Sequence, residues 1–183
     1  MIAAGSTAPA LVCPNSRTPL PSLGEWQNDQ AQCGSCREIF RNHKGVLRFV
    51  REDAYTRSFS YEWNKHRTTL LDAAGRRSGE ESLKKFLLSP ELVRGKHVLD
   101  AGCGTGRFTD VFHRWGAAHV TAVDLSQSVE VARENIGDRD NVTFVQGDLM
   151  RLPFPKQSFD VILSWGVLHH TPNCAAAFRE LAT

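Results

Sequence analysis

The stretch from Val98 to Gly106, Val-Leu-Asp-Ala-Gly-Cys-Gly-Thr-Gly, constrains the fold more than any other part of the chain. Two β-forming residues lead into an acid, and glycines follow at alternate positions, which suits a turn where a Cβ would block a positive φ or a close backbone approach. The next residues place their apolar side chains at helical spacing: Phe108, Val111, Phe112 and Trp115. The stretch therefore predicts a strand, a tight turn and a helix whose free N–H groups face a ligand over the turn.

The spacing of the glycines excludes two common nucleotide-binding loops. A dinucleotide fingerprint would need glycine or alanine at Arg107, and no Gly-Lys-Ser/Thr ending of a Walker loop occurs in the chain. The observed pattern, Asp-x-Gly-x-Gly-x-Gly from Asp100 to Gly106, resembles the first motif of class I S-adenosylmethionine-dependent methyltransferases. The resemblance implies that the loop holds a zwitterionic amino acid and a ribose; the alternative is a glycine-rich turn without a ligand.

Residues 97–183 alternate between strand and helix patterns, which predicts parallel βαβ units. The expected strands are His97–Asp100, His119–Asp124, Val142–Gln146 and Phe159–Ser164. We predict an α/β fold, a Rossmann-like half-sheet of parallel strands in the order 3-2-1-4 with flanking helices. The seven-stranded sheet that the resemblance implies has three further strands. We therefore expect a truncated chain with an apolar edge at its fourth strand, through which it self-associates or binds a completing partner.

The expected helices carry apolar side chains at helical spacing. Leu83, Phe86 and Leu87 share one face, and a second short helix begins at Ser89-Pro90 and stops at Gly95. A helix capped at Ser126 turns Val129, Ala132 and Ile136 inward. A last helix begins near Asn173 or Cys174 and buries Phe178 and Leu181.

Ligands of open parallel sheets lie outside the carboxyl ends of the strands. Asp124 closes the second strand, where a carboxylate can accept hydrogen bonds from both ribose hydroxyls. The resemblance implies that Asp148 accepts from the adenine amino group and that Leu125 and Leu149 pack on the two faces of the ring. Cys103, inside the loop, is interpreted as a small packed residue rather than a nucleophile. The predicted cofactor-binding residues are Asp100, Gly102, Cys103, Gly104, Gly106, Asp124, Leu125, Asp148, Leu149, Ser164, Trp165 and Gly166.

The segment Ser164-Trp165-Gly166-Val167-Leu168-His169-His170 follows the fourth strand. In the family that it resembles, this segment faces the methyl acceptor, and it lacks the Asn/Asp-Pro-Pro-Tyr/Phe signature of amino-group methylators. The resemblance therefore favours a small-molecule acceptor. His169 or His170 is the candidate general base, because imidazole titrates near neutral pH. The alternative is a helix cap and a solvated side chain, since in-line displacement at a sulfonium methyl depends mostly on positioning.

Cysteines near the start of the chain suggest a degenerate metal site. Cys33-Gly-Ser-Cys36 is an intact knuckle, whereas Cys13-Pro-Asn-Ser16 has a serine where a second cysteine would complete a four-thiolate site. With the hairpin pattern that follows, residues 11–49 resemble the zinc-ribbon segment fused to some methyltransferases. Cys13, Cys33 and Cys36 are the candidate zinc ligands and His43 a possible fourth. We favour the alternative, a packed hairpin without metal, because a serine hydroxyl is a poor zinc ligand.

Between these regions lies a charged and aromatic segment. We predict a division into a zinc-ribbon-like segment (1–50), a helical linker and cofactor lid (51–96) and an S-adenosylmethionine-binding core (97–183). Tyr55 to Arg67 resembles the linker that covers the cofactor in related methyltransferases. Phe59 and Trp63, at i and i+4, are interpreted as core anchors, and His66 and Arg67 stay open.

Composition sets limits on partners and compartment. The net charge is +2, but residues 1–96 hold 15 basic and 10 acidic side chains, whereas residues 97–183 hold 7 and 10. No apolar run is long enough to span a membrane, and five irregularly spaced cysteines suit a reducing compartment, so we expect a cytoplasmic protein. The prediction is methyl transfer from S-adenosylmethionine to a small molecule. A non-catalytic cofactor-binding fragment or scaffold is the second hypothesis, and an RNA-directed methyltransferase guided by the basic half is the third.

Overall fold

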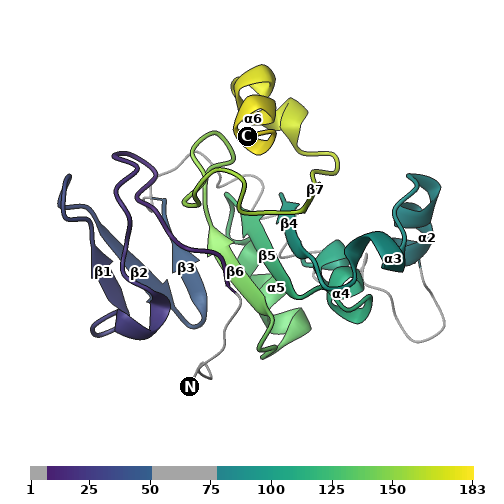
Figure 1. Ribbon diagram of the computed structural model, residues 1–183, viewed down its shortest axis with the longest axis horizontal. Helices are drawn as coiled ribbons and strands as arrows, with labels where there is room; N and C mark the ends of the chain where they lie inside the picture. Colours follow the sequence, from purple (N-terminus) through teal and green to yellow (C-terminus); the bar gives the residue numbers. More distant parts are fainter. Residues whose placement is uncertain (1–7, 51–77) are drawn as a thin grey trace.

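The computed structural model describes residues 8–50 and 78–183, which form one mixed sheet with helices and loops on both faces (Figure 1). The predicted linker from Tyr55 to Arg67 lies outside the described residues. The elements are η1 (Leu23–Glu25), β1 (Gln30–Gln32), β2 (Ile39–His43), β3 (Val46–Arg48), α2 (Ser78–Lys85), α3 (Pro90–Val93), β4 (His97–Ala101), α4 (Arg107–Arg114), β5 (His119–Asp124), α5 (Ser128–Ile136), β6 (Val142–Gln146), β7 (Val161–Leu163), η2 (Leu168–His170) and α6 (Cys174–Leu181).

The strand order is β1-β2-β3-β6-β5-β4-β7. The four strands of the carboxyl-terminal half are parallel, and their order, β6-β5-β4-β7, is the predicted 3-2-1-4. The β2–β3 hairpin, also predicted, extends this sheet because β3 pairs in parallel with β6, with Leu47 opposite Val145. The amino-terminal ribbon is therefore part of the same sheet, an arrangement that its local sequence pattern did not indicate.

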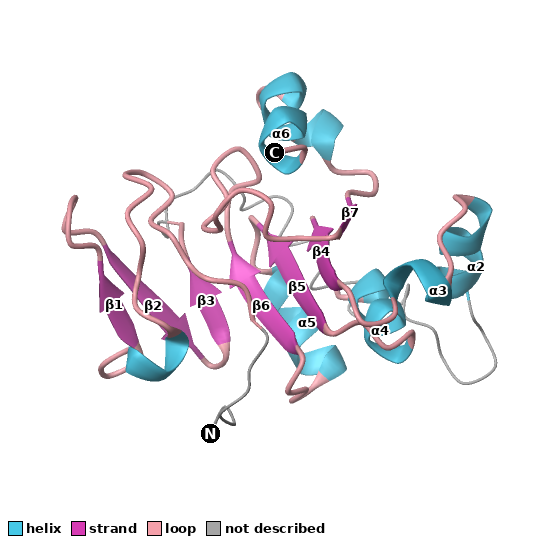
Figure 2. Cartoon of the chain, viewed as in Figure 1, coloured by secondary structure: helices cyan, strands magenta, loops and turns pink. Residues whose placement is uncertain are grey.

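The two faces of the sheet have different covers, and the alternation of side chains along each strand separates them. Val98 and Val120 pack beneath Phe112 of α4, and Ala122 and Phe144 pack beneath α5. The opposite face is covered by loops and α6, as the pink segments above the strands show (Figure 2). The apolar residues buried on this second face include Leu11, Phe40, Leu47, Phe49, Leu99, Ala101, Val123, Val145, Leu149, Leu152, Phe154 and Leu181.

Polar contacts bind the amino-terminal ribbon to the carboxyl-terminal half. The Arg17 guanidinium donates to the carbonyls of Leu152 (2.7 Å) and Phe154 (2.6 Å), and the Val12 N–H donates to the Pro153 carbonyl (2.9 Å). On the other side of the hairpin, Arg48 donates to side chains of both β6 and α5. These contacts join segments more than 80 residues apart in the chain.

The expected burial of three apolar side chains is wrong. Phe86 (61% exposed) and Leu87 (86%) do not share the buried face of Leu83, because α2 ends at Lys85 and Leu87 adopts a positive φ of 63°. Phe178 on α6 is 61% exposed, and Ala177 takes the buried position beside Leu181. The other predicted helix positions are confirmed: Val129, Ala132 and Ile136 are buried on α5, as are the four apolar residues at and after α4.

Within residues 8–50 and 78–183, none of the helices combines the length and the apolar character that crossing a bilayer requires.

Candidate functional site

The loop after β4 has the geometry that its glycines predict. Gly102, Gly104 and Gly106 have φ values of 86°, 52° and 90°. The N–H groups of Gly102 and Cys103 donate to the Val123 carbonyl, at 2.7 and 2.9 Å, so the loop crosses over the end of β5. A Cβ on Gly102 would lie 2.3 Å from Val167 Cγ2, and one on Gly106 would lie 2.7 Å from Ile136 Cδ1. Two of the three glycines are therefore required by close packing as well as by conformation.

Asp124, at the carboxyl end of β5, is held against this loop. Its Oδ2 accepts from the Gly104 N–H (2.9 Å), and its Oδ1 accepts from the Ser126 N–H (2.9 Å) and hydroxyl (2.7 Å). The carboxylate is half-buried, and the second lone pair of Oδ2 can accept a further hydrogen bond. The structure thus places Asp124 beside the glycine loop in a fixed orientation, ready to accept from a ligand hydroxyl.

Asp100 faces the protein rather than the loop opening. It is 2% exposed, and its Oδ2 accepts from the Thr109 hydroxyl of α4 at 2.6 Å. Burial, partly offset by the Thr109 hydrogen bond, raises the pKa of Asp100 to about 6. Asp100 therefore anchors the first turn of α4 to β4. The glycine motif, which identified Asp100, did not predict that Thr109 is its hydrogen-bond partner.

Cys103 is buried in the loop, and its pKa is raised well above the ordinary thiol value by burial, with the charges of Asp124 and Asp100 adding to the shift. A thiol in this state is a poor nucleophile near neutral pH, as expected for a packed residue. The Asn135 side-chain amide of α5 donates to the neighbouring Thr105 carbonyl at 3.0 Å. The loop is thereby supported from α5 as well as from β5.

The segment after β6 lies at the same edge of the sheet as the glycine loop. Asp148 is half-buried and its Oδ1 accepts from the Met150 N–H at 2.9 Å, which shapes the turn. Leu125 is half-buried, whereas Leu149 is 4% exposed and packs in the core with Val123 and Val145.

The segment after β7 adds an aromatic group that sequence reasoning missed. The Trp165 ring contacts Phe86 at the end of α2 (centroids 4.4 Å apart) and Phe108 of α4 (5.5 Å). Phe86 and Trp165 are 61% and 37% exposed. Because these residues come from three distant segments, the only sequence signal was the aromatic character of each. Next to them, the Ser164 hydroxyl is buried and has no hydrogen-bond partner among the described residues.

His169 and His170 lie in η2 and are both exposed, with their ring centroids 3.9 Å apart. They follow Val167, whose side chain packs on Gly102. The structure therefore brings the histidine pair to the same end of the sheet as the glycine loop.

The polar and apolar groups at this site fit S-adenosylmethionine, the cofactor that the glycine motif implies. The ligand offers ribose hydroxyls, which require an acceptor, and Asp124 supplies a carboxylate fixed beside the loop. Its amino-acid carboxylate requires N–H donors, which the first turn of α4 provides after Gly106. Its adenine requires an acceptor near apolar side chains, and Asp148 lies beside Leu149 in the segment after β6.

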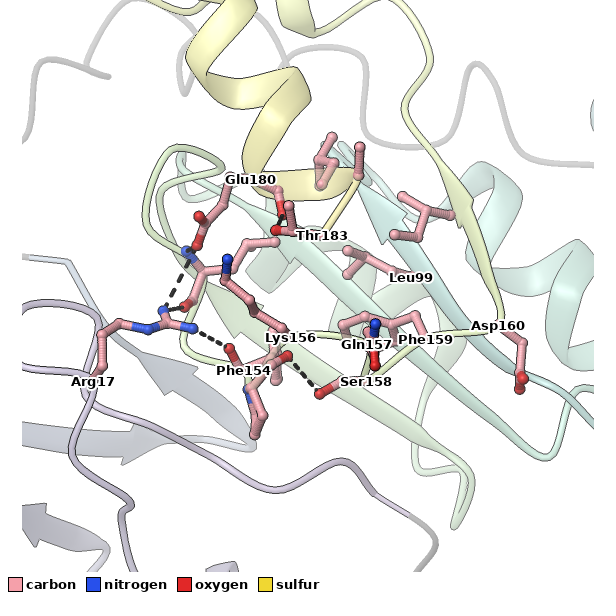
Figure 3. Close-up of a pocket in the computed structure, with 15 residues that line it drawn as sticks. Arg17, Leu99, Phe154, Lys156, Gln157, Ser158, Phe159, Asp160, Glu180 and Thr183 are labelled. Carbon is pink, nitrogen blue, oxygen red and sulfur yellow. Dashed lines mark hydrogen bonds and ion pairs between the residues drawn. The ribbon is translucent and has the colours of Figure 1, made fainter.

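A separate hollow of about 320 Å³ lies between α6 and the loop that leads into β7 (Figure 3). Leu99 lines its floor, and Arg17 reaches its rim, 3.7 Å from Glu180 Oε1. Its lining residues include neither the glycine loop nor Asp124. This hollow is therefore distinct from the candidate cofactor site.

The three cysteines predicted as metal ligands are brought together. The sulfur atoms of Cys13, Cys33 and Cys36 lie within 4.8 Å of one another, and His43 is not in this group. Hydrogen bonds from the Ser16 hydroxyl and the Cys36 N–H lower the pKa of Cys33 to about 6. All three thiols are free.

Known proteins match the part of the chain that carries the candidate cofactor site. Residues 98–183 match the family described as "Methyltransferase domain". A sterol 24-C-methyltransferase from Gibberella zeae is 35% identical over 92 residues, which cover 48% of this chain and 24% of that protein. A demethylmenaquinone methyltransferase from Staphylococcus aureus is 34% identical over 101 residues, 54% of this chain and 42% of that protein. The chain spans less than half the length of these curated relatives.

Solved structures share the fold of this region. An S-adenosylmethionine-dependent methyltransferase from Mesorhizobium loti matches with a TM-score of 0.50 and 32% identity, over 58% of this chain and 48% of that one. A structure described as the [4+2]-cyclase SpnF matches with a TM-score of 0.51 and 27% identity, over 60% of this chain and 42% of that one.

Proposed function

Because residues 98–183 belong to the class I S-adenosylmethionine-dependent methyltransferases, we propose that this chain binds S-adenosylmethionine and transfers its methyl group to a small-molecule acceptor. The observation that carries the proposal is the Asp124 carboxylate held against the glycine loop by the Gly104 N–H at 2.9 Å. When bound, the cofactor supplies an electrophilic methyl group on a sulfonium centre. The residues of the chain hold and orient it.

Each cofactor-binding residue has a proposed role. Asp124 accepts from the ribose hydroxyls, Gly104 and Gly106 let the backbone approach the ligand, and Asp148 accepts from the adenine amino group. Leu125 and Leu149 are assigned to the adenine faces. The remaining predicted contacts are assigned to the amino-acid end: Gly102, Cys103, Ser164, Trp165 and Gly166. Asp100, which is buried, is proposed to act indirectly by ordering the first turn of α4 through Thr109.

The acceptor is proposed to be an apolar, ring-containing small molecule. Trp165 packs on Phe86 and on the buried Phe108 of α4, the helix that follows the glycine loop, and the rings of Phe86 and Trp165 are partly exposed. Aromatic rings of this kind favour planar apolar ligands through stacking and edge contacts. The relatives named for a sterol and for demethylmenaquinone support such an acceptor class.

His169 and His170 are proposed to take the proton of an acceptor hydroxyl as it attacks the methyl group. Both are exposed and follow the segment that packs on Gly102, so they are accessible to a molecule bound over the loop. A His169→Gln, His170→Gln double variant should lower the methyl-transfer rate while leaving cofactor affinity unchanged.

Calorimetric titration with S-adenosylhomocysteine tests the binding step. We expect micromolar affinity in the wild type and a loss of about a hundredfold in Asp124→Ala, since a charged acceptor of ligand hydroxyls is removed. Asp124→Asn, which keeps the side-chain shape, separates loss of charge from loss of folding, and circular dichroism monitors both variants. Asp140→Ala removes an exposed carboxylate before β6 and serves as the matched control. Equal affinity in the wild type and both Asp124 variants would refute the assignment.

A transfer assay with labelled cofactor tests the second step. Hydroxylated quinones and sterols, an arginine-containing peptide and RNA are offered in parallel, and labelled small molecules are expected. If the chain binds the cofactor but labels none of these acceptors, that outcome supports the scaffold hypothesis. This outcome needs its own assay because a cyclase shares the fold. Salt-dependent labelling of RNA would support the third hypothesis.

Under the same proposal, the chain divides into three parts: residues 1–50 form the ribbon, residues 51–96 act as a lid over the cofactor, and residues 97–183 form the cofactor-binding core.

A further inference from the structure

The two short loops that carry Cys13 and Cys33 have the same backbone geometry. In the first, the Cys13 N–H donates to the Thr18 carbonyl at 2.8 Å, and the Arg17 N–H donates to the Cys13 carbonyl at 2.8 Å. In the second, the Cys33 N–H donates to the Glu38 carbonyl at 2.8 Å, and the Arg37 N–H donates to the Cys33 carbonyl at 3.0 Å. The two loops are therefore equivalent with an offset of 20 residues.

Both loops also hold an arginine in a conformation that arginine seldom adopts. Arg17 and Arg37, at equivalent positions, have φ values of 60° and 63°. A non-glycine residue in this region costs on the order of 1 kcal/mol and persists where the surroundings fix it. The repetition of the same strained turn indicates that the backbone is set to aim side chains at a common point.

The equivalence assigns a position to Ser16. An offset of 20 residues pairs Cys13 with Cys33 and Ser16 with Cys36, and both Ser16 and Cys36 are exposed. The Ser16 hydroxyl lies 3.3 Å from Cys33 Sγ, and Cys13 Sγ lies 3.5 Å from Cys36 Sγ. The Ser16 hydroxyl therefore lies beside the Cys33 thiol at the position that corresponds to Cys36, and it also donates to the Thr18 hydroxyl at 3.0 Å.

The cluster of the Cys13, Cys33 and Cys36 thiols has a size that fits one metal ion. Tetrahedral zinc with Zn–S bonds near 2.3 Å places its sulfur atoms about 3.8 Å apart. The three sulfur atoms here lie within 4.8 Å of one another, and two of them are closer than that ideal edge. Cys13 and Cys33 are fully buried, so the cluster is shielded from one side and open at Cys36 and Ser16.

We propose that Cys13, Cys33 and Cys36 bind a thiolate-preferring divalent cation, zinc in the first instance, with an open fourth position at Ser16. Three thiolates supply the affinity, whereas the neutral Ser16 hydroxyl is a weak ligand that leaves the fourth position to water or an external donor. The ion joins the loop of Cys13 to the β1–β2 loop that holds Cys33 and Cys36. Arg17, in the first of these loops, donates in turn to the Leu152 and Phe154 carbonyls. The site does not depend on methyl transfer.

Cobalt substitution tests the proposal on the whole chain of residues 1–183, kept reduced. We expect a tetrahedral Co²⁺ spectrum with sulfur-to-metal charge-transfer intensity for three thiolates, and displacement of Co²⁺ by Zn²⁺. Zinc should also raise the thermal midpoint, and a chelator should reverse the shift.

Two variants and a control make the test specific. Ser16→Cys should add the intensity of a fourth thiolate and tighten zinc binding by at least about tenfold, because a thiolate replaces a neutral oxygen. Cys33→Ser should lose the spectrum, and Cys174→Ser, an exposed cysteine on α6, should leave it unchanged. A wild-type chain without charge-transfer absorption overturns the proposal, whether or not Ser16→Cys acquires it. Equal spectra and affinities in the wild type and Cys33→Ser overturn it as well.

Discussion

At the scale of single residues, two glycines on either side of β4 are required for different reasons, one by backbone conformation alone and the other by close packing as well. Gly95 and Gly102 both have a positive φ (71° and 86°), but a Cβ at Gly95 would meet nothing within 4 Å, whereas one at Gly102 would meet Val167 at 2.3 Å. The pair therefore separates the cost of the backbone conformation from the cost of the steric overlap.

We expect Gly95→Ala to lower the free energy of unfolding by about 1 kcal/mol, the cost of a left-handed alanine. Gly102→Ala should lower it by about 2–4 kcal/mol, because overpacking against Val167 adds to that cost. Chemical denaturation measures both. The Gly102→Ala, Val167→Ala double variant should recover part of the loss by removing the overlap, and strictly additive losses would contradict the explanation.

The buried carboxyl of Asp100 predicts a pH-dependent stability. Its pKa of about 6 in the folded chain lies above the value near 4 of an unfolded chain, so between these pH values the folded state binds more protons. The contribution of Asp100 to stability therefore falls as the pH rises from 4 to 6, and the full penalty is present above pH 6.

Asp100→Asn keeps the acceptor for Thr109 and removes the buried charge. We expect this variant to be more stable than the wild type by about 1–3 kcal/mol at pH 7.5, with the difference vanishing near pH 4. Denaturation curves at several pH values test this. The opposite contribution of His119, whose pKa burial lowers to about 4, is common to both proteins and cancels. A stability difference independent of pH would contradict the assignment.

At the scale of elements, Arg48 joins the hairpin to the sheet. Its guanidinium donates to Gln146 on β6 and Glu130 on α5, and the Phe49 N–H donates to the Gln146 carbonyl at 2.9 Å. We expect Arg48→Ala to lower the free energy of unfolding by about 1–3 kcal/mol, because a half-buried charged contact is lost and Gln146 and Glu130 lose their guanidinium partner.

Hydrogen exchange can locate this effect. Amides of β3 and the Phe49 N–H should exchange faster in Arg48→Ala, whereas those of β4 and β5 keep their protection. Arg41→Ala on β2, where the side chain is exposed, is the matched control. Uniformly faster exchange over the whole sheet would show that the hairpin does not open as a unit.

At the scale of the whole molecule, β7 is one of the two edge strands of the described sheet, and it pairs only with β4 among the described strands. Its central residue, Ile162, is 38% exposed beside the hollow under α6. Exposed apolar edge strands pair with other chains. We expect the chain to self-associate as concentration rises, and Ile162→Lys to reduce this association by at least about tenfold. Sedimentation velocity measures it, and Leu92→Lys, which places the same charge on an exposed apolar position of α3, should leave it unchanged.

The sequence alone determined the features that depend on neighbouring residues. Turn chemistry and periodicity are local, so the glycine loop, the helix after it, the four parallel strands and Asp124 at the strand end could all be predicted. The same reasoning failed at Phe178, because helical spacing predicts a shared face but not which neighbour covers it. It failed at Phe86 and Leu87 because the spacing did not reveal that α2 ends at Lys85.

Tertiary structure decided the rest, because it concerns contacts between distant segments. The pairing of β3 with β6 joins residues about 100 positions apart, and no local pattern specifies which sheet edge a hairpin meets. The aromatic group of Phe86, Phe108 and Trp165 and the thiol cluster beside Ser16 arise in the same way. Sequence spacing suggested ligands, but only the equivalent folding of two separated loops brought their side chains to one point.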